Sequence, residues 1–327
     1  MGGGETVLEV RDLRTYFPTM RGTVKAVDGI SFTVLEGETV GLVGESGCGK
    51  STAALSIMRL VPAPGRIVGG EILLRGRNLL KLSEAEMREI RGAKIAMSFQ
   101  DPMTFFNPVM RIGDQIAEGV IRHQRLSRKE AWEKVISTLE VVGIPSPRDV
   151  AMSYPHQLSG GMRQRAMMAM ALSCHPELMI ADEPTTALDV IIQAQLLELM
   201  KDLKKELGMS SLIISHDFGV IAELCERVAV MYAGKIVEYS DIRRILWKPR
   251  HPYTIGLLES IPRVGFRKER LIGIEGSVPD LVDPPPGCRF YPRCKYADER
   301  CKEDPQLLEL EEGHYVLCHH PVMGEAR

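Results

Sequence analysis

The sequence predicts an α/β domain whose largely parallel sheet is interrupted by a helical insertion and followed by a small irregular tail. Short apolar runs alternate with helical patterns. These runs are the predicted strands: Val7–Val10, Ile30–Val34, Thr39–Val43, Lys94–Phe99, Leu178–Asp182, Leu212–Ser215 and Val228–Tyr232. No such run occurs between Phe99 and Leu158, and prolines accumulate after Tyr232. The gap therefore predicts the helical insertion, and the prolines predict the irregular tail.

Composition excludes several classes of protein. The 327 residues are 44% hydrophobic and 26% charged, which is ordinary globular composition and argues against disorder and low complexity. The 41 basic and 43 acidic side chains give a net charge of −2, so bulk charge does not favour a nucleic acid. The longest apolar run, Ala166–Leu172, is far shorter than the roughly 20 residues of a spanning helix. The N-terminus lacks the pattern of a secretory signal, so we expect a cytosolic chain.

Two capping boxes predict where helices begin. Ser83 with Glu86 precedes a short helix, and Ser127 with Glu130 lies inside the insertion. After the second box, apolar residues recur at near-helical spacing until Gly143, which is expected to end the helix. The insertion is therefore expected to be helical rather than a long loop.

A glycine-rich segment follows the predicted strand Thr39–Val43 and opens a helix that is expected to run to about Leu60. Its sequence, GESGCGKS, fits the pattern G-x-x-x-x-G-K-[ST]. In that pattern, glycines let backbone N–H groups surround a β-phosphate, Lys50 neutralises phosphate oxygens and the Ser51 hydroxyl ligates Mg²⁺. The predicted contacts to the nucleotide are Gly44, Ser46, Gly47, Cys48, Gly49, Lys50, Ser51 and Thr52.

Two carboxylates end the predicted buried strand Leu178–Asp182, at the sheet edge where open α/β sheets bind ligands. Alone, such a pair is also typical of a solvated strand end. With a phosphate loop upstream, Asp182 is expected to hold Mg²⁺, and Glu183 is placed to polarise the water that attacks the phosphate.

A second glycine pair lies about 20 residues before Asp182, at the start of a predicted helix. Ser159 and the N–H groups of Gly160 and Gly161 would form a second anion site at this helix N-terminus. The helical insertion separates this site from the phosphate loop. The separation suggests two subunits packed head to tail, each completing the other's nucleotide site.

Residues 7–240 resemble the ATP-binding cassette (ABC) family, whose motifs all occur here in the expected order. The resemblance implies a RecA-like P-loop NTPase core with an antiparallel β subdomain and a helical insertion. It implies a core of residues 1–100 and 160–240, a helical signature subdomain of residues 101–159 and a C-terminal extension of residues 241–327. One departure is Met162, where the family's signature usually ends in glutamine.

The same resemblance implies roles for further residues. Gln100 would sense Mg²⁺ and the γ-phosphate, His216 would contact the γ-phosphate, and Asp189, in the segment Ala187-Leu-Asp189, would communicate across the dimer. The family also stacks adenine on an aromatic ring near the first strand. Tyr16 and Phe17 are both candidates, and their spacing favours Phe17.

The tail resembles the C-terminal region of oligopeptide and dipeptide importer ATPases. Three stretches carry this resemblance: His251–Thr254, Gly273–Asp280 and Gly287–Cys294. It implies a peripheral ATPase on the cytoplasmic side of the cell membrane that works with a second, identical or homologous cassette. Two separate permease subunits and, indirectly, a solute-binding protein would complete the transporter. Peptides are the expected cargo, with metal chelates or oligosaccharides as alternatives.

Four cysteines, Cys288, Cys294, Cys301 and Cys318, cluster near the C-terminus. In a reducing cytosol, four close cysteines favour metal ligation over disulfides. The resemblance implies a [4Fe–4S] cluster, and four thiolates suit one. A zinc site remains the alternative because three histidines lie nearby, although no C-x₂₋₄-C knuckle is present. These histidines are His314, His319 and His320.

The expected activity is therefore ATP hydrolysis, with ATP, Mg²⁺ and a [4Fe–4S] cluster as cofactors. Two other classes are disfavoured. Cassette ATPases that act on nucleic acid or ribosomes carry coiled-coil arms or two cassettes in one chain, and this sequence shows neither feature. Its net charge of −2 and its lack of a basic stripe also argue against a nucleic-acid partner. A small-molecule kinase or GTPase would share the phosphate loop but would not explain Leu158–Met162.

Overall fold

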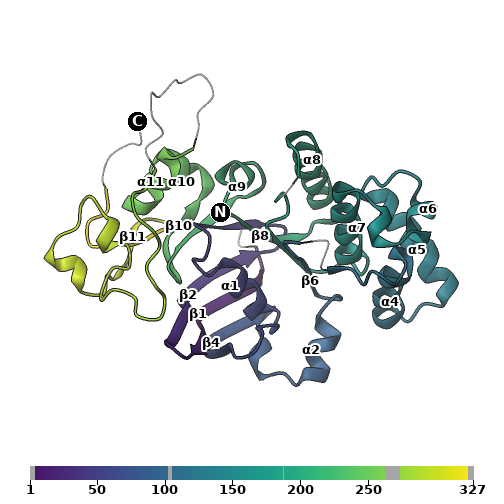
Figure 1. The fold of residues 1–327 in the computed structure, drawn as a ribbon, viewed down its shortest axis with the longest axis horizontal. Coiled ribbons are helices and arrows are strands. Elements are labelled where there is room, and N and C mark those ends of the chain that lie inside the picture. Colours follow the sequence, from purple (N-terminus) through teal and green to yellow (C-terminus); the bar gives the residue numbers. More distant parts are fainter. Residues whose placement is uncertain (1–3, 102–104, 187, 262–272, 323–327) are drawn as a thin grey trace. The chain divides into compact units, whose positions relative to one another are not determined.

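The structure, a computed structural model, describes residues 4–101, 105–186, 188–261 and 273–322 (Figure 1). The chain divides into two compact units. The first comprises residues 1–7, 34–38 and 81–213, and the second comprises residues 8–33, 39–80 and 214–327. The second unit thus contains the glycine-rich segment and the C-terminal tail, whereas the first contains the helical insertion.

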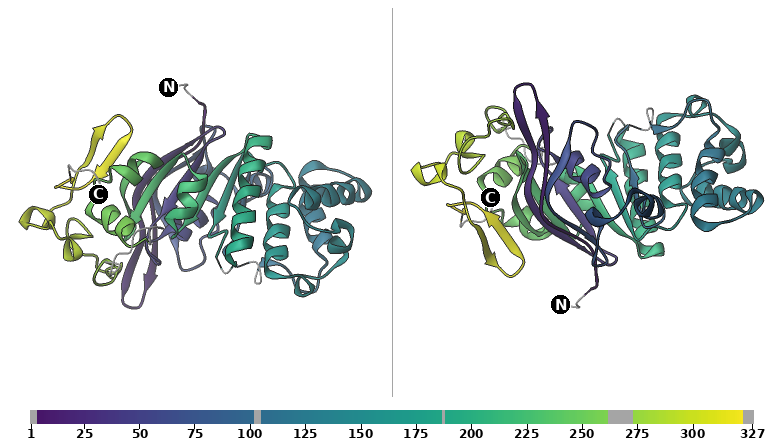
Figure 2. Two further views of the ribbon diagram at one scale, coloured as in Figure 1. Left: turned by 90° about the horizontal axis from the view of Figure 1, so that it is seen from above. Right: turned by 90° about the horizontal axis from the view of Figure 1, so that it is seen from below.

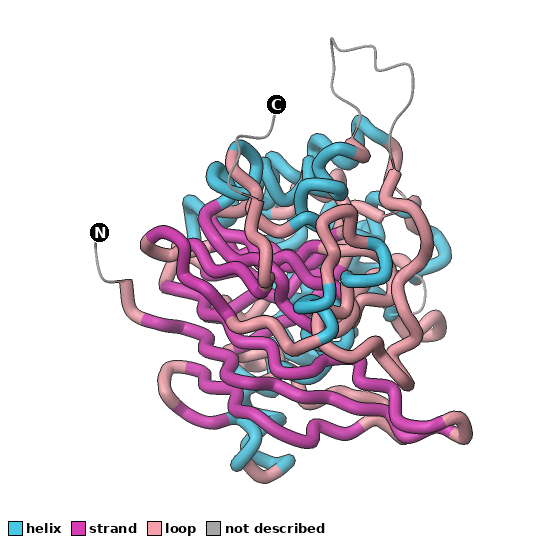
Figure 3. The backbone as a smooth tube through the Cα atoms, turned by 90° about the vertical axis from the view of Figure 1, so that its left-hand side faces the viewer, coloured by secondary structure: helices cyan, strands magenta, loops and turns pink. Residues whose placement is uncertain are grey.

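Most of a four-stranded sheet belongs to the second unit, with the strand order β2-β1-β4-β5. Its strands are β1 (Thr6–Thr19), β2 (Gly22–Leu35), β4 (Arg66–Leu74) and β5 (Arg77–Asn78). Figure 3 shows its long strands in magenta. β1 pairs antiparallel with β4, and the register shifts near Arg11 and Arg14. Gly70 fits this irregularity because a Cβ there would lie 2.5 Å from the carbonyl oxygen of Asp12. The antiparallel β subdomain is confirmed.

The second unit also contains five strands in the order β11-β12-β10-β9-β3. They are β3 (Thr39–Val43), β9 (Arg227–Tyr232), β10 (Lys235–Asp241), β11 (Leu307–Glu311) and β12 (His314–Leu317). β3 runs parallel to β9, and the remaining pairs are antiparallel. Every residue of β3 is buried, as expected for the apolar run Thr39–Val43.

The tail differs from the expected irregular segment because it supplies a β-hairpin, drawn in yellow in both views of Figure 2. β12 pairs with β10, with Tyr315 opposite Tyr239. Leu and Glu alternate from Leu308 to Glu311, and Gly313 supplies the turn at φ 74°. The residues of β11 carry only a weak strand pattern, and the prolines before them hide it.

Short helices complete the second unit. They are α1 (Lys50–Ile57), α9 (Phe218–Leu224), α10 (Ile242–Trp247) and α11 (Pro252–Glu259), with single-turn 3₁₀ helices at Leu79–Lys81, Tyr291–Arg293 and Glu299–Lys302. α9 lies close to β3, where a Cβ on Gly41 would fall 2.8 Å from the Ile221 side chain. α1 ends three residues before the expected Leu60.

Parallel strands and helices form the first unit. Its strands run in the order β8-β7-β6, with β6 (Ile95–Ser98) parallel to β7 (Leu178–Asp182) and with most of β8 (Ser210–Ser215) included. The short helix α2 (Glu84–Ile90) begins at the expected capping box of Ser83 and Glu86. The predicted α/β class with a parallel sheet is confirmed.

The remaining helices of this unit are α4 (Ile112–Gln124), α5 (Arg128–Val141), α6 (Pro147–Met152), α7 (Gly160–Leu172) and α8 (Val190–Leu207), with one 3₁₀ turn at Pro155–Gln157. α4 to α7 lie together in Figure 1. Ser127 and Glu130 form the expected capping box of α5. Close packing of α4 requires Gly113, because a Cβ there would fall 2.6 Å from the Trp132 ring.

Candidate functional site

The glycine-rich segment forms a tight loop between β3 and α1. Gly49 is the N-terminal cap of α1 at φ 108°, and a Cβ there would lie 2.0 Å from the carbonyl oxygen of Ala26. A Cβ on Gly44 would lie 2.1 Å from the carbonyl oxygen of Met231. Only glycine fits both positions, because backbone rather than a flexible side chain occupies the space. The sequence therefore places Gly44 and Gly49 where the loop has no room for a side chain.

Lys50 lies inside this loop and is only 6% exposed. Its Nζ donates to the carbonyl oxygens of Gly44, at 2.7 Å, and Glu45, at 3.0 Å. Cys48 is buried, and this burial raises the pKa of its thiol. Ser51 and Thr52 follow in the first turn of α1. The loop thus holds a cation at a helix N-terminus, an arrangement that can bind phosphate.

Both aromatic candidates for adenine stacking lie near the end of β1 and are partly buried. The Tyr16 hydroxyl donates to Asp28 Oδ1 at 2.6 Å, and burial together with this bond raises the pKa of Tyr16 to about 12. The Phe17 ring lies against Gly65, where a Cβ would fall 2.4 Å from it. Neither contact tests which ring meets adenine, so Phe17 stays a prediction.

His216 follows β8 and is exposed. It precedes Asp217, whose side chain caps α9 by accepting the Gly219 N–H at 2.7 Å. His216 belongs to the same unit as the glycine-rich loop. Its contact with a γ-phosphate is not tested and stays a prediction.

The two carboxylates at the end of β7 are buried in the first unit. Asp182 is 5% exposed and Glu183 is 8% exposed. Glu183 has φ 50°, a left-handed conformation that is unusual for a residue with a side chain and that often marks functional sites. The Thr186 hydroxyl donates to Glu183 Oε2 at 3.1 Å, which orients the carboxylate. Gln100 is exposed, two residues after β6.

A buried amide that the sequence did not point to supports this turn. Gln164 of α7 is 3% exposed, and its Nε2 donates to the carbonyl oxygen of Pro184 at 2.9 Å. The residue after Glu183 is therefore attached to the helix that Ser159 caps. In the sequence, Gln164 lies between Arg163 and Arg165, so no local pattern marks it as a buried residue.

The second predicted anion site is an open cavity of about 490 Å³ in the first unit. It brings together Ser159, Gly160, Gly161 and Asp189, and Met162 also lines it. Two helices begin there. Ser159 Oγ accepts the Met162 N–H at 3.3 Å, and Asp189 Oδ1 accepts the Ile192 N–H at 2.9 Å. Both helix N-termini face one space, which favours an anion. Ala187, named with Asp189 above, lies outside the described residues.

The four tail cysteines line one small cavity in the second unit, together with His319 and His320. None of the four forms a disulfide. The Cys288 N–H donates to the carbonyl oxygen of Cys301 at 2.9 Å, which holds two of the cysteine segments together. Burial and the proximity of the other three thiols raise the pKa of Cys318 to about 12. Four convergent sulfurs form a donor set that fits a thiolate-bound metal group.

The histidines near this cavity differ in their partners. His314 is buried with Nε2 2.8 Å from Glu238 Oε1, on β12 rather than in the cysteine cavity. His319 Nε2 lies 3.0 Å from the carbonyl oxygen of Glu303. His320 groups with Asp298 and Cys301, whose ligand atoms all lie within 4.8 Å of one another. A zinc site would therefore draw on His320 rather than His314.

Comparison with known proteins matches both parts of the chain. The ABC transporter family model matches residues 27–186, and the model for the oligopeptide/dipeptide transporter C-terminal region matches residues 237–301. A probable peptide ABC transporter ATP-binding protein of Sinorhizobium fredii is 53% identical over 317 residues, covering 96% of this chain and 95% of that protein. The dipeptide transport ATP-binding protein DppD of Bacillus subtilis is 52% identical, covering 96% and 94%.

The chain belongs to the ABC transporter family. A solved dimeric ATP-binding cassette in a post-hydrolysis state, bound to ADP and Pi, matches this cassette with a TM-score of 0.66 and 26% identity. That match covers 72% of this chain and 99% of the solved one. The cassette is an ABC-type ATPase, as the sequence predicted, and ATP and Mg²⁺ are its expected cofactors. Among the helices of the described residues, none is long and apolar enough to cross a membrane.

Proposed function

We propose that this cassette ATPase powers the import of oligopeptides or dipeptides through separate membrane permease subunits. The observation that carries the proposal is the match over 96% of the chain to proteins named for peptide and dipeptide transport. The match includes the C-terminal region, which is named for oligopeptide/dipeptide transporters. Metal chelates and oligosaccharides remain the alternative cargo.

The nucleotide chemistry is assigned to the predicted residues. Lys50 binds the β- and γ-phosphates, and Glu183 orients and activates the attacking water. Mg²⁺, when bound, would neutralise phosphate oxygens, and Ser51, Asp182 and Gln100 are the residues that would hold it. His216 contacts the γ-phosphate, and Phe17 stacks on adenine. The buried carboxylate of Glu183, with its left-handed backbone, supports the assignment of the base.

The second cassette binds head to tail, so that the Ser159–Gly161 site of one protomer meets the ATP held by Lys50 of the other. The open cavity with two helix N-termini supports this arrangement, because nothing lies within 4 Å of a Cβ placed on Gly160. ATP drives closure through its higher affinity for the closed dimer. Asp189 lies at the same cavity and communicates across the interface.

Two permease subunits and, indirectly, a solute-binding protein complete the transporter, and the ATPase sits peripherally on the cytoplasmic side of the membrane. The family match supports this partnership. The residues of the helical subdomain transmit closure to the permease. No feature of the described residues favours a nucleic-acid partner.

The cysteine cavity binds a [4Fe–4S] cluster through Cys288, Cys294, Cys301 and Cys318. All four side chains line one cavity, and thiolate sulfur is the ligand type that such clusters use. The ligands lie in three separate tail segments, so a bound cluster would crosslink a region with little apolar core of its own. Zinc bound with His320 is the alternative.

Uptake and hydrolysis test the transport function together. The chain should co-purify with permease subunits, and peptides with their binding protein should stimulate its ATPase activity in reconstituted vesicles. Hydrolysis that responds to a metal chelate or an oligosaccharide instead would change the cargo. Hydrolysis stimulated by DNA or RNA rather than by permease would overturn the transport function.

Anaerobic purification tests the cluster. Protein that carries it should be brown, with iron and sulfide near four per chain. Colourless protein with stoichiometric zinc would overturn the iron–sulfur assignment. A Cys301→Ser variant should lose the bound metal in either case, which confirms the cavity as its location.

A further inference from the structure

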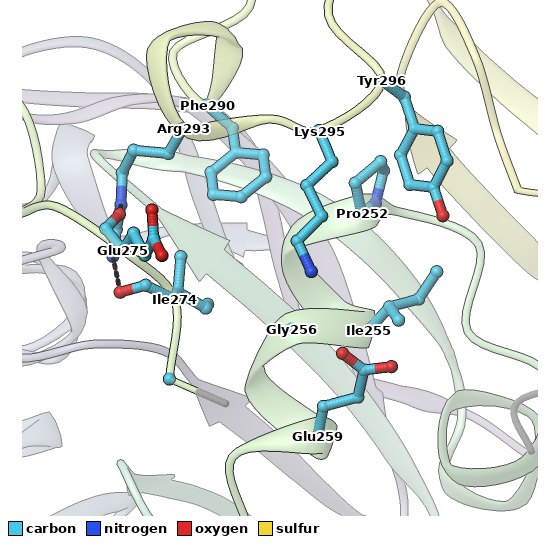
Figure 4. Close-up of a pocket in the computed structure, with 11 residues that line it drawn as sticks. Pro252, Ile255, Gly256, Glu259, Ile274, Glu275, Phe290, Arg293, Lys295 and Tyr296 are labelled. Carbon is cyan, nitrogen blue, oxygen red and sulfur yellow. Dashed lines mark hydrogen bonds between the residues drawn. The ribbon is translucent and has the colours of Figure 1, made fainter. Parts of the chain in front are cut away.

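Arg293, the residue before Cys294, uses all five of its N–H donors. Nε donates to the carbonyl oxygen of Glu275 at 2.9 Å, and Nη2 reaches the neighbouring carbonyl oxygens of Ile274 and Gly276 at 3.2 and 3.3 Å. Figure 4 shows Arg293 beside Glu275 and Ile274. The remaining donors, on Nη1, point to the core of the second unit. A lysine could not reproduce this arrangement, because its three donors radiate from one atom.

The main partner of Nη1 is Glu45, the second residue of the phosphate loop. Nη1 lies 2.9 Å from Glu45 Oε2 and 3.3 Å from the Tyr232 hydroxyl. The Arg293 side chain is only 7% exposed, so little solvent screens this ion pair. A second bond holds the same residue, since the Glu45 N–H donates to the Tyr253 hydroxyl at 2.9 Å. The phosphate loop is therefore fixed at Glu45 by two tail residues, Arg293 and Tyr253 of α11.

Arg289, the residue after Cys288, reaches the other side of the loop. It is buried, and it donates to the carbonyl oxygen of Ala233 and to Asp28. Gly234, which follows Ala233, donates its N–H to the carbonyl oxygen of Cys48 in the phosphate loop at 2.8 Å. Arg289 thus fixes the β9–β10 turn that supports the loop.

The short segment Cys288–Cys294 therefore has two faces. Its cysteines line the sulfur cavity, and its two arginines contact the phosphate loop or its support. Phe290 lies between them, buried, with its ring 5.2 Å from that of Tyr232. Because only five residues separate the two cysteines, we expect a change in the cavity to displace both arginines.

We propose that Arg293 and Arg289 are positioning residues that hold the phosphate loop in its nucleotide-binding shape, and that nucleotide affinity is consequently coupled to the occupancy of the cysteine cavity. The positioning role of the two arginines depends only on nucleotide binding by the phosphate loop. The coupling to the cysteine cavity depends also on the metal site proposed above. Coupling is reciprocal, so bound nucleotide must retain the metal as strongly as the metal favours nucleotide.

Nucleotide titration tests the positioning role. Arg293→Met and Glu45→Ala should each weaken binding of a fluorescent ATP analogue about tenfold, the scale of a buried hydrogen bond to a charged group. The double variant should be little weaker than either single one, because the two substitutions remove the same interaction. The KM for ATP should rise while kcat at saturating ATP stays within about twofold, a pattern that a general loss of stability does not produce.

Matched variants keep this test decisive. Arg21→Met is the control, because Arg21 also pairs with a tail carboxylate, Asp280 at 3.2 Å, but at the exposed surface. It should bind nucleotide as the parent does. If Arg293→Met fails to fold, Glu45→Ala and Tyr253→Phe, which leave Arg293 and the cysteine segment in place, replace it. Parental nucleotide affinity in the folded variants, or additive effects in the double variant, would overturn the positioning role.

Metal release tests the coupling. Protein purified with its metal is mixed with excess chelator, and release is followed with and without MgADP. We expect MgADP to slow release about threefold or more in the parent and to have no effect in Arg293→Met. Equal rates in the parent overturn the coupling. Protein that never holds metal overturns the metal site and with it the coupling, whereas the nucleotide titration still decides the positioning role.

Discussion

The two glycine-rich anion sites of this ATPase are built in opposite ways. In the phosphate loop, a Cβ on Gly49 would lie 2.0 Å from a backbone oxygen, and Lys50 is almost fully buried. In the open cavity lined by Ser159, Gly160, Gly161 and Asp189 (the signature cavity), a Cβ on Gly160 would meet nothing within 4 Å, and Ser159 is exposed. The first loop is closed by its own chain. The second is open, and two helices begin at it.

This difference indicates how each motif depends on its surroundings. The glycines of the phosphate loop are required by the fold, so changing them should damage the protomer itself. Gly160 of the signature cavity is not required by the fold, so changing it should damage only what the assembled dimer does. The following substitutions separate these two kinds of dependence.

The largest effect is expected for Glu183→Gln, which leaves both anion sites intact and removes the proposed base. Steady-state hydrolysis should fall about a thousandfold, within the range of general-base catalysis. ATP should still bind, and closed dimers should accumulate, measurable by size-exclusion chromatography with ATP. Near-parental hydrolysis in this variant would remove Glu183 from the base role.

Lys50→Ala tests the closed site alone. It removes the buried amine that would bind the phosphate oxygens through charge-assisted hydrogen bonds. Affinity for a fluorescent ATP analogue should therefore fall about a hundredfold. Closed dimers should fail to form at nucleotide concentrations that saturate Glu183→Gln. Unchanged affinity would show that the loop binds nucleotide through its backbone alone.

Gly49→Ala and Gly160→Ala form a matched pair that compares the two sites directly. The first forces a side chain into a left-handed backbone against a carbonyl oxygen, so the free energy of unfolding should fall by about 2 kcal/mol or more and nucleotide binding should be lost. The second places alanine in the first turn of α7, where it should leave stability unchanged or raise it by up to about 1 kcal/mol. Its hydrolysis should fall only in the assembled state. Equal stability losses would contradict the comparison.

A modest loss of stability is expected for Ser159→Ala. Loss of the cap that accepts the Met162 N–H should cost about 1 kcal/mol and lower Tm by about 3 °C, measured by thermal denaturation. Binding of nucleotide to isolated protomers should not change, because the cap lies in the other unit from Lys50. A fall in that binding would show that the two sites are not separate.

Local chemistry explains what the sequence could predict. The strand Leu178–Asp182 and both capping boxes depend on neighbours within a few residues, and the structure confirms them. Signature residues could be grouped with Asp189 only through the family resemblance. The structure places them around one cavity because two helices begin there.

Long-range contacts explain what the sequence could not predict. Arg293 is 248 positions from Glu45, and no local pattern distinguishes it from a surface arginine. The β-hairpin of the tail was hidden for a related reason, since β12 is stabilised by pairing with the distant β10. The bounds of α1 were overestimated because apolar residues continue past the end of the helix.

The bond from Gln164 to Pro184 has a consequence for the timing of hydrolysis. In the proposed head-to-tail pair, α7 begins at one ATP while Pro184 follows the base that acts on the other. A single amide would then join the residues that contact two different ATP molecules, so that hydrolysis of one ATP would alter the geometry at the other and the two sites would not act independently.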